Sequence, residues 1–116
     1  MLRRIRILLD ECVHAHVRKA FPRHVVRTVA EAGWQTTKDA PLLGLAASRF
    51  DVFVTVDRAF EQEFRRSETR LGLVMVVDLP SNRLESFLPI FDRLLLAANA
   101  VKPGEVIHVS ARDRCV

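Results

Sequence analysis

Acidic residues stand at the ends of several apolar runs in this 116-residue chain. Asp10 and Glu11 follow "IRILL", Asp57 follows "VFVTV", Asp78 follows "LVMVV", and Asp39 opens the segment "DAPLLGLAA". Carboxylates that converge repel one another and raise each other's pKa, and a hard divalent cation such as Mg²⁺ relieves that repulsion. An ion held in this way can activate water and stabilise an in-line displacement at phosphorus.

Each acid also has a simpler interpretation. Aspartate is a preferred helix N-cap that stabilises a helix by about 1 kcal/mol, and Asp10, Asp39 and Asp57 each precede a helical segment. Glu11 also fits a solvated first-turn residue favoured by the helix dipole, and Asp78 fits a polar turn. Taken together, Asp10, Asp39 and Asp57 favour a metal-binding acidic cluster over three unrelated caps.

Polar and basic residues accompany these acids. Thr55 precedes Asp57 by two, so both face the same side of a strand, and Thr55 could hydrogen-bond an acid or a metal-bound water. Lys38 and Arg58 each adjoin a candidate acid, where they could hold a phosphate or simply be solvated. Asn82 forms a plausible capping box with the glutamate three residues later.

Cys12, His14 and His16 suggest two other chemistries, both weaker. The spacing C-x-H-x-H lacks the second half of a closed zinc site. A Cys12 nucleophile with His16 as its base, at i and i+4, lacks an identifiable oxyanion hole and orienting partner. We therefore expect Cys12 and Cys115 to be free thiols.

Five short apolar runs, rich in β-branched residues, predict the strands that would position these side chains: 5–9, 25–29, 52–56, 73–77 and 106–109. Helical spacing between them predicts a mainly parallel sheet with crossover helices. The first, third and fourth runs are nearly continuous and predict central strands, whereas polar residues in the second and fifth predict edges. The order 2-1-3-4-5 satisfies both features.

The segment 84–98 carries the clearest helical pattern. Its apolar residues fall at i, i+3, i+4 and i+7 and predict one helix face: Leu84, Phe87, Leu88, Phe91, Leu94, Leu95 and Ala98. Gly33 is expected to supply a positive φ after a short turn, and Trp34 to pack there. If strands one and three are adjacent, Asp10 and Asp57 become neighbours at the carboxyl edge, with Asp39 near the same rim.

Composition sets the class of protein. The chain has the length of one domain (1–116), and 49% hydrophobic residues supply a core without a metal or disulfide staple. No apolar run approaches the roughly 20 residues of a membrane span, and no signal-peptide pattern is visible, so we expect a soluble cytoplasmic protein. A net charge of +4 permits an anionic partner, and four scattered glycines argue against a nucleotide-cofactor domain.

The ordered segments "ILLDEC", "GW…KDAPLLGLA", "DVFVTVDRAF", "LVMVV" and "SNRLE" resemble the PIN-like domain family, small relatives of the VapC-type toxins of bacterial toxin–antitoxin systems. The resemblance implies a three-layer α/β/α sandwich around a central, mainly parallel five-stranded sheet. It also implies Mg²⁺ or Mn²⁺ and hydrolysis of RNA phosphodiester bonds. Two departures are that Asp78 matches a fourth acid only loosely, and that Ala40 stands where an acid often follows.

On this resemblance, Asp10 and Asp57 would be the principal metal ligands, Asp39 would complete the cluster and Glu11 would assist catalysis. The implied partners are RNA and a cognate antitoxin protein, and toxins of this type often form homodimers. Residues that could hold the RNA backbone are Lys38, Arg58 and Arg83, and supporting residues are Thr55, Asp78 and Asn82.

Two other functions stay open at this point. One is a catalytically inactive PIN-like module in which the acids act as caps and the basic residues bind nucleic acid or protein. The other is a receiver-like signalling domain, in which Asp57 would be the phospho-acceptor. The receiver class also requires a lysine after the last strand, and none follows in "VIHVSARDR".

Overall fold

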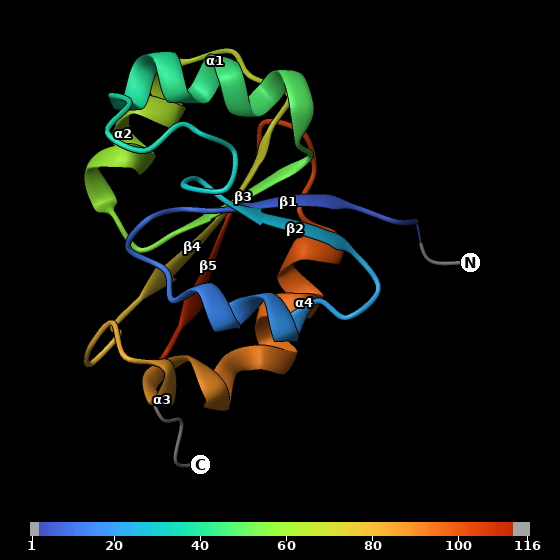
Figure 1. Cartoon of the computed structure of the whole chain (residues 1–116), viewed down its shortest axis with the longest axis vertical. Coiled ribbons are helices and arrows are strands. Elements are labelled where there is room, and N and C mark those ends of the chain that lie inside the picture. Colours follow the sequence, from blue (N-terminus) through green and yellow to red (C-terminus); the bar gives the residue numbers. More distant parts are fainter. Residues whose placement is uncertain (1–2, 113–116) are drawn as a thin grey trace.

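A computed structural model describes residues 3–112 of the chain. Its centre is a five-stranded sheet in which every neighbouring pair of strands is parallel, with helices on both faces (Figure 1). The strands are β1 (Arg6–Leu9), β2 (Val25–Thr28), β3 (Val52–Thr55), β4 (Gly72–Val77) and β5 (Val106–Ser110). The helices are η1 (Ala15–Ala20), α1 (Asp39–Arg49), α2 (Arg58–Arg66), α3 (Leu84–Phe87), η2 (Leu88–Ile90) and α4 (Phe91–Ala100).

The strand order is β2-β1-β3-β4-β5, which confirms the order predicted from the sequence. All four residues of β3 are buried, as are the first five of β4, whereas the edge strands β2 and β5 each have exposed positions. Burial on both faces explains why the central strands are nearly continuous apolar runs. The order also makes β1 and β3 direct neighbours, which brings the ends of the two strands together.

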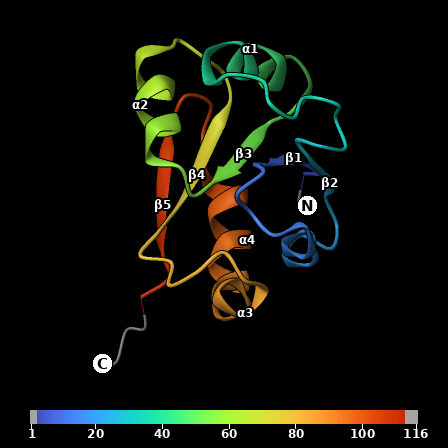
Figure 2. The same ribbon diagram turned by 60° about the vertical axis from the view of Figure 1, so that its left-hand side comes forward.

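Each face of the sheet has its own hydrophobic core. Ile7 and Leu9 point to the face covered by η1, α3, η2 and α4, while Leu8 points to the face covered by α1 and α2 (Figures 1 and 2). This alternation follows from the period of two along a strand. Because both faces are covered, the edge formed by the carboxyl ends of the strands is where polar side chains from several elements can meet.

The single helix predicted over 84–98 is wrong. The segment is divided into α3, η2 and α4, and Pro89 lies in η2 between the two α-helices. Proline has no backbone N–H and clashes with the carbonyl four residues earlier, so it interrupts a regular helix. The interruption also changes which side chains are buried, because Leu88 is 51% exposed and Ile90 is fully buried.

The predicted capping box of Asn82 is also wrong. The N-cap residue of α3 is Arg83, which makes no capping hydrogen bond with its side chain. The nearby Ser81 hydroxyl instead accepts a hydrogen bond from the Arg83 N–H and lies 2.9 Å from the Ser86 hydroxyl. A short serine side chain can bond the backbone two residues on, which competes with the capping box.

The loop before α1 follows the prediction. Gly33 has φ of +81°, the left-handed conformation that glycine adopts without steric penalty. Trp34 packs on the core under α1, with its ring edge-on to Phe50 at a centroid distance of 5.9 Å. Across residues 3–112, none of the helices is both long enough and apolar enough to cross a membrane.

Candidate functional site

Asp10 ends β1, and its carboxylate is held in a fixed orientation. Its Oδ1 accepts a hydrogen bond from the Glu11 N–H at 2.8 Å, and its Oδ2 accepts one from the Thr55 hydroxyl at 2.6 Å. The Asp10 backbone N–H donates to the Val54 carbonyl of β3 at 3.0 Å. Side chain and backbone together therefore tie the end of β1 to the end of β3.

Thr55 connects the two principal acids. It is the one fully buried polar side chain among the described residues, and its hydroxyl donates to Asp10 while accepting from the Asp57 backbone N–H at 3.0 Å. A buried hydroxyl needs such partners, because leaving them unpaired costs about 1–3 kcal/mol. The expectation that Thr55 hydrogen-bonds an acid is confirmed.

Asp57 lies beside this bridge as the N-cap of α2. Its Oδ1 accepts a hydrogen bond from the Ala59 N–H at 2.9 Å, so the capping interpretation of Asp57 is confirmed. Its Oδ2 makes no hydrogen bond within the part of the chain that the structure describes. One capping oxygen leaves the other free to bind a cation, so the capping role does not exclude a metal-binding role.

Asp39 reaches the same region from α1, of which it is the first residue. Burial raises the pKa of the Asp39 carboxyl, and the nearby charges of Asp57, Asp10 and Glu63 raise it further. Carboxylates act on one another in this way only when they are close and poorly screened. Asp10 and Asp57 therefore lie close enough to Asp39 for their charges to act on it.

Glu63 was not among the residues singled out in the sequence. It lies on α2, which packs beside α1, and so its charge acts on Asp39. It follows Asp57 by six residues within a helical segment, a spacing that carries no signal of its own. The packing of α1 against α2 therefore brings the Glu63 charge near Asp39.

Glu11 points to the loop that precedes α1. Its Oε1 accepts a hydrogen bond from the Thr36 N–H at 3.3 Å. Thr36 has φ of +65°, which is rare for a β-branched residue and needs support from its surroundings. The structure therefore gives Glu11 a role in holding the loop that leads to Asp39.

Asp78 is directed away from the acidic cluster and toward β5. Its Oδ2 accepts a hydrogen bond from the Ser110 hydroxyl at 2.9 Å, and Oδ1 lies 3.9 Å from the Arg112 guanidinium. Asp78 is not among the carboxylates that act on Asp39. Asn82, another of the residues expected to support the site, is exposed on the loop after β4.

The three predicted basic residues occupy different places. Lys38 is the N-cap of α1 and Arg58 is the first residue of α2, so each adjoins one acid of the cluster. Arg83 stands before α3 and forms an exposed ion pair with Glu85 at 3.5 Å. Lys38 and Arg58 are therefore better placed than Arg83 to contact a ligand bound at the acids.

Cys12 does not have the surroundings of a nucleophile. Its Sγ lies 3.5 Å from Asp10 Oδ2 and 3.6 Å from Thr55 Oγ1, while the His16 ring lies beside His14. Burial raises the pKa of the Cys12 thiol, and a reactive cysteine needs a lowered one. Cys12 is a free thiol, as expected, and Cys115 lies outside the described residues.

The fit of a metal ion depends on how many side chains must bind it directly. Within residues 3–112, no group of three or more His, Cys, Asp or Glu side chains is arranged to hold a metal ion. Mg²⁺ keeps several of its waters and often uses only one or two carboxylates. Thr55 bonds the Asp10 carboxylate and the Asp57 backbone N–H, and the charges of both acids act on Asp39, so the donors present fit an ion of this second kind.

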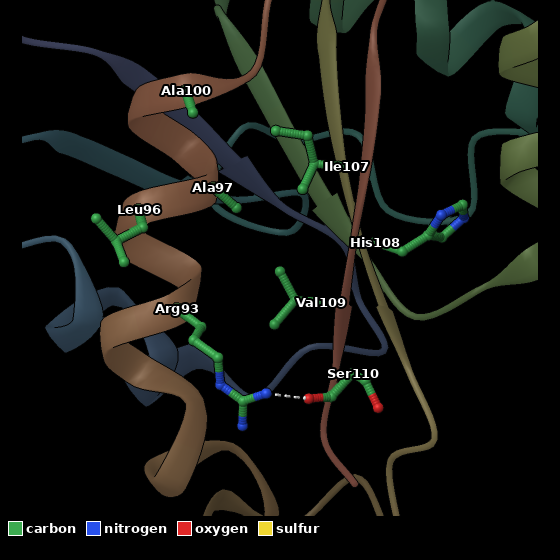
Figure 3. A pocket seen from close by; sticks show the side chains of 8 residues that line it. All are labelled: Arg93, Leu96, Ala97, Ala100, Ile107, His108, Val109 and Ser110. Carbon is green, nitrogen blue, oxygen red and sulfur yellow. Dashed lines mark hydrogen bonds between the residues drawn. The ribbon is translucent and has the colours of Figure 1, made fainter. Parts of the chain in front are cut away.

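A concave surface of the molecule lies between α4 and the edge strand β5 (Figure 3). Ile107 and Val109 point into it, the 67%-exposed Leu96 lies on its α4 side, and Arg93 donates a hydrogen bond to the Ser110 carbonyl at 2.7 Å. Its lining contains no carboxylate, so this groove lacks the oxygen ligands of the acidic edge.

Comparisons of this chain with protein-family models, with curated proteins and with solved structures found no match.

Proposed function

We propose that this protein is a Mg²⁺- or Mn²⁺-dependent endoribonuclease that hydrolyses RNA phosphodiester bonds in the cytoplasm, as the toxin of a toxin–antitoxin pair. The observations that carry the proposal are that Asp10 and Asp57 follow the adjacent parallel strands β1 and β3, and that the charges of both act on Asp39 at the start of α1. The mutual repulsion of these carboxylates makes a cation the complementary ligand. The resemblance of the sequence to PIN-like domains supplies the substrate class.

Each residue of the site has a stated part in this proposal. Asp10 and Asp57 would bind the divalent ion, and Asp39 would add negative charge beside it. A bound ion supplies an activated water and offsets charge on the phosphoryl oxygens. Thr55 keeps the Asp10 carboxylate in place through the hydrogen bond at 2.6 Å, and Glu11 holds the loop before Asp39.

Cleavage of RNA by the Asp10→Asn variant is the direct test. Asparagine keeps an oxygen that can accept from Thr55 but removes the charge, so we expect cleavage with Mn²⁺ to fall more than about 100-fold. That loss exceeds the usual effect of changing a residue behind a metal ligand. Asp51→Asn lies at the amino ends of the strands, away from the acids, so it is the matched control and should cleave as the wild type does. If Asp10→Asn cleaves RNA as fast as Asp51→Asn does, the proposal is refuted.

A binding module is the alternative, and it is favoured by the lack of three directly ligating side chains among the described residues. In that case Asp57 serves as a helix cap and Asp10 as an anchor for Thr55, while basic residues bind RNA or protein. Such a module should bind RNA at every Mn²⁺ concentration without cleaving it. The proposed antitoxin would cover the acidic edge, and its co-purification with the chain would report that contact.

A further inference from the structure

A hollow of about 320 Å³ lies beside the acidic edge, between α2 and the sheet. It is lined by the first two turns of α2, by Val77 at the end of β4 and by His108 of β5. Figure 2 shows α2 next to β5, and Figure 3 shows the His108 ring on the side of β5 opposite Ile107 and Val109. The hollow is therefore separate from the groove between α4 and β5.

Hydrogen bonds fix two of the basic side chains in this hollow. Glu61 Oε2 accepts from Arg65 Nε at 2.9 Å and Nη2 at 2.7 Å, and Oε1 lies 2.8 Å from His108 Nε2. Burial alone would raise the pKa of Glu61, but the bonds from His108 and Arg65 outweigh it and lower that pKa. Both carboxylate oxygens of Glu61 therefore already have hydrogen-bond partners, and they hold the Arg65 and His108 side chains in place.

Arg58 is the remaining basic side chain in the lining of the hollow, and it does not bond Glu61. Residues 58, 61, 62 and 65 fall at i, i+3, i+4 and i+7, so Arg58 and Arg65 lie on one face of α2. Arg58 is exposed and forms no ion pair within the part of the chain that the structure describes. Its planar guanidinium offers a fork of donors suited to phosphate oxygens.

The hollow is close to the candidate metal ligands. Arg58 follows Asp57 directly in the chain. In the sheet register Thr55 is level with Met75, and Met75 is level with His108, so Thr55 and His108 are two strands apart. Two strand spacings are about 10 Å. An RNA strand carries a phosphate at every nucleotide, so a short stretch of one strand can reach both places.

We propose that this hollow binds a backbone phosphate of the RNA strand, so that the substrate leaves the acidic edge over α2 and β5. The phosphate contacts Arg58, with Arg65 and His108 on the far side of the hollow held by Glu61. The inference rests on the proposed function for its ligand, because it names the path of that substrate. It assigns no binding role to the loop before α3, where Arg83 is paired with Glu85.

Binding of a short fluorescein-labelled oligouridine, measured by fluorescence anisotropy with EDTA present, tests the proposal without any cleavage. Arg58→Gln should weaken binding about tenfold, the effect of losing one charged hydrogen-bonded contact. It should also reduce the slope of log affinity against log salt by about 0.7, the value for one phosphate on a single strand. Arg66→Gln is the matched control, since it removes the same charge from the same helix without lining the hollow.

The outcomes separate this inference from the nuclease proposal. A loss specific to Arg58→Gln supports the subsite even if the wild type proves unable to cleave RNA. Equal binding by Arg58→Gln and Arg66→Gln, or no binding of oligouridine by the wild type, overturns the subsite even if cleavage is observed. If inorganic phosphate displaces the oligonucleotide at equal molar concentration, the hollow binds a small anion and the RNA assignment is overturned.

Discussion

Acidic side chains have opposite surroundings, and opposite pKa shifts, at the two ends of the central strands. At the start of β3, Asp51 accepts hydrogen bonds from the Arg6 backbone N–H at 2.8 Å and from its guanidinium at 3.2 and 3.3 Å. Burial alone would raise the pKa of Asp51, but these bonds and the charge of Arg6 lower it. At the other end, burial and the charges of Asp57 and Asp10 raise the pKa of Asp39.

This contrast separates a structural acid from acids available for binding. Asp51 has a basic partner and stabilises the folded chain when it is ionised. Asp39 faces other carboxylates, so its ionised form is less stable in the folded chain than in the unfolded one. A protein can tolerate the second arrangement when a ligand relieves it, and functional sites commonly contain such perturbed groups.

The largest expected effect is the response to a divalent ion. Mn²⁺ at 100 times its dissociation constant should raise the free energy of unfolding by about 2.7 kcal/mol, because it binds the folded state alone. Asp10→Asn should remove most of that gain, and Asp51→Asn should keep it. Thermal unfolding of the three proteins with and without Mn²⁺ measures this difference. If neither Mn²⁺ nor Mg²⁺ raises the free energy of unfolding of the wild type, the acids at the carboxyl ends of the strands are structural, as Asp51 is.

Removing the buried hydroxyl that joins the acids should have the next largest effect. Thr55→Val keeps the shape of the side chain but leaves the Asp57 N–H and Asp10 Oδ2 without this partner. We expect a loss of about 1–3 kcal/mol in the free energy of unfolding. Thr55→Ser keeps the hydroxyl and should lose only about 0.8 kcal/mol, from one missing methyl group. Urea unfolding compares the two, and equal losses would show that the hydroxyl bridge is not what Thr55 contributes.

Asp51→Asn should have a smaller effect that depends on pH. Because folding lowers the pKa of Asp51, its stabilisation is fully present above the ordinary value of 3.8 and disappears as pH falls through the lower, folded value. Arg6 is 53% exposed, so the loss at neutral pH should be under about 1 kcal/mol. Urea unfolding of both proteins from pH 7 to acid should show the two curves converging. A difference independent of pH would contradict the ion-pair assignment.

Asp39→Asn should have the smallest effect and the opposite sign. Removing a charge that faces other acids should raise the free energy of unfolding at neutral pH with EDTA present, within about 0.5 kcal/mol. As pH falls, Asp39 becomes protonated in the folded chain first, so the advantage of asparagine should fade. Thermal unfolding at two pH values measures it. Destabilisation at neutral pH would show that Asp39 acts as a helix-terminal residue rather than as a member of the cluster.

Particular residues show how far the sequence leads. The continuous apolar character of "VFVTV" and "LVMVV" correctly predicted two buried central strands, and the expectation that Thr55 hydrogen-bonds an acid was also correct. The helical period over 84–98 failed at Pro89, because a pattern of apolar spacing does not register a missing N–H in the backbone. The capping box failed for a similar reason, since Ser81 offered a competing hydrogen bond.

Some residues of the candidate site could be identified from the sequence and others could not. Asp10, Asp39 and Asp57 could be chosen from the sequence because each follows or opens a recognisable element. Asp78 could be chosen on the same ground, yet its side chain accepts a hydrogen bond from Ser110 and lies 3.9 Å from the Arg112 guanidinium. Glu63 could not be chosen, because its effect on Asp39 depends on how α1 lies against α2.

The sequence alone determined the sheet order, the central and edge strands, and the edge at which acids gather, because these follow from local periodicity and from chain connectivity. The tertiary structure alone decided which acids meet and which are paired. Side-chain partners such as Thr55 with Asp10, Arg6 with Asp51 and His108 with Glu61 come from positions about 45 residues apart. Contacts of that separation depend on packing in three dimensions, which no local pattern in the chain records.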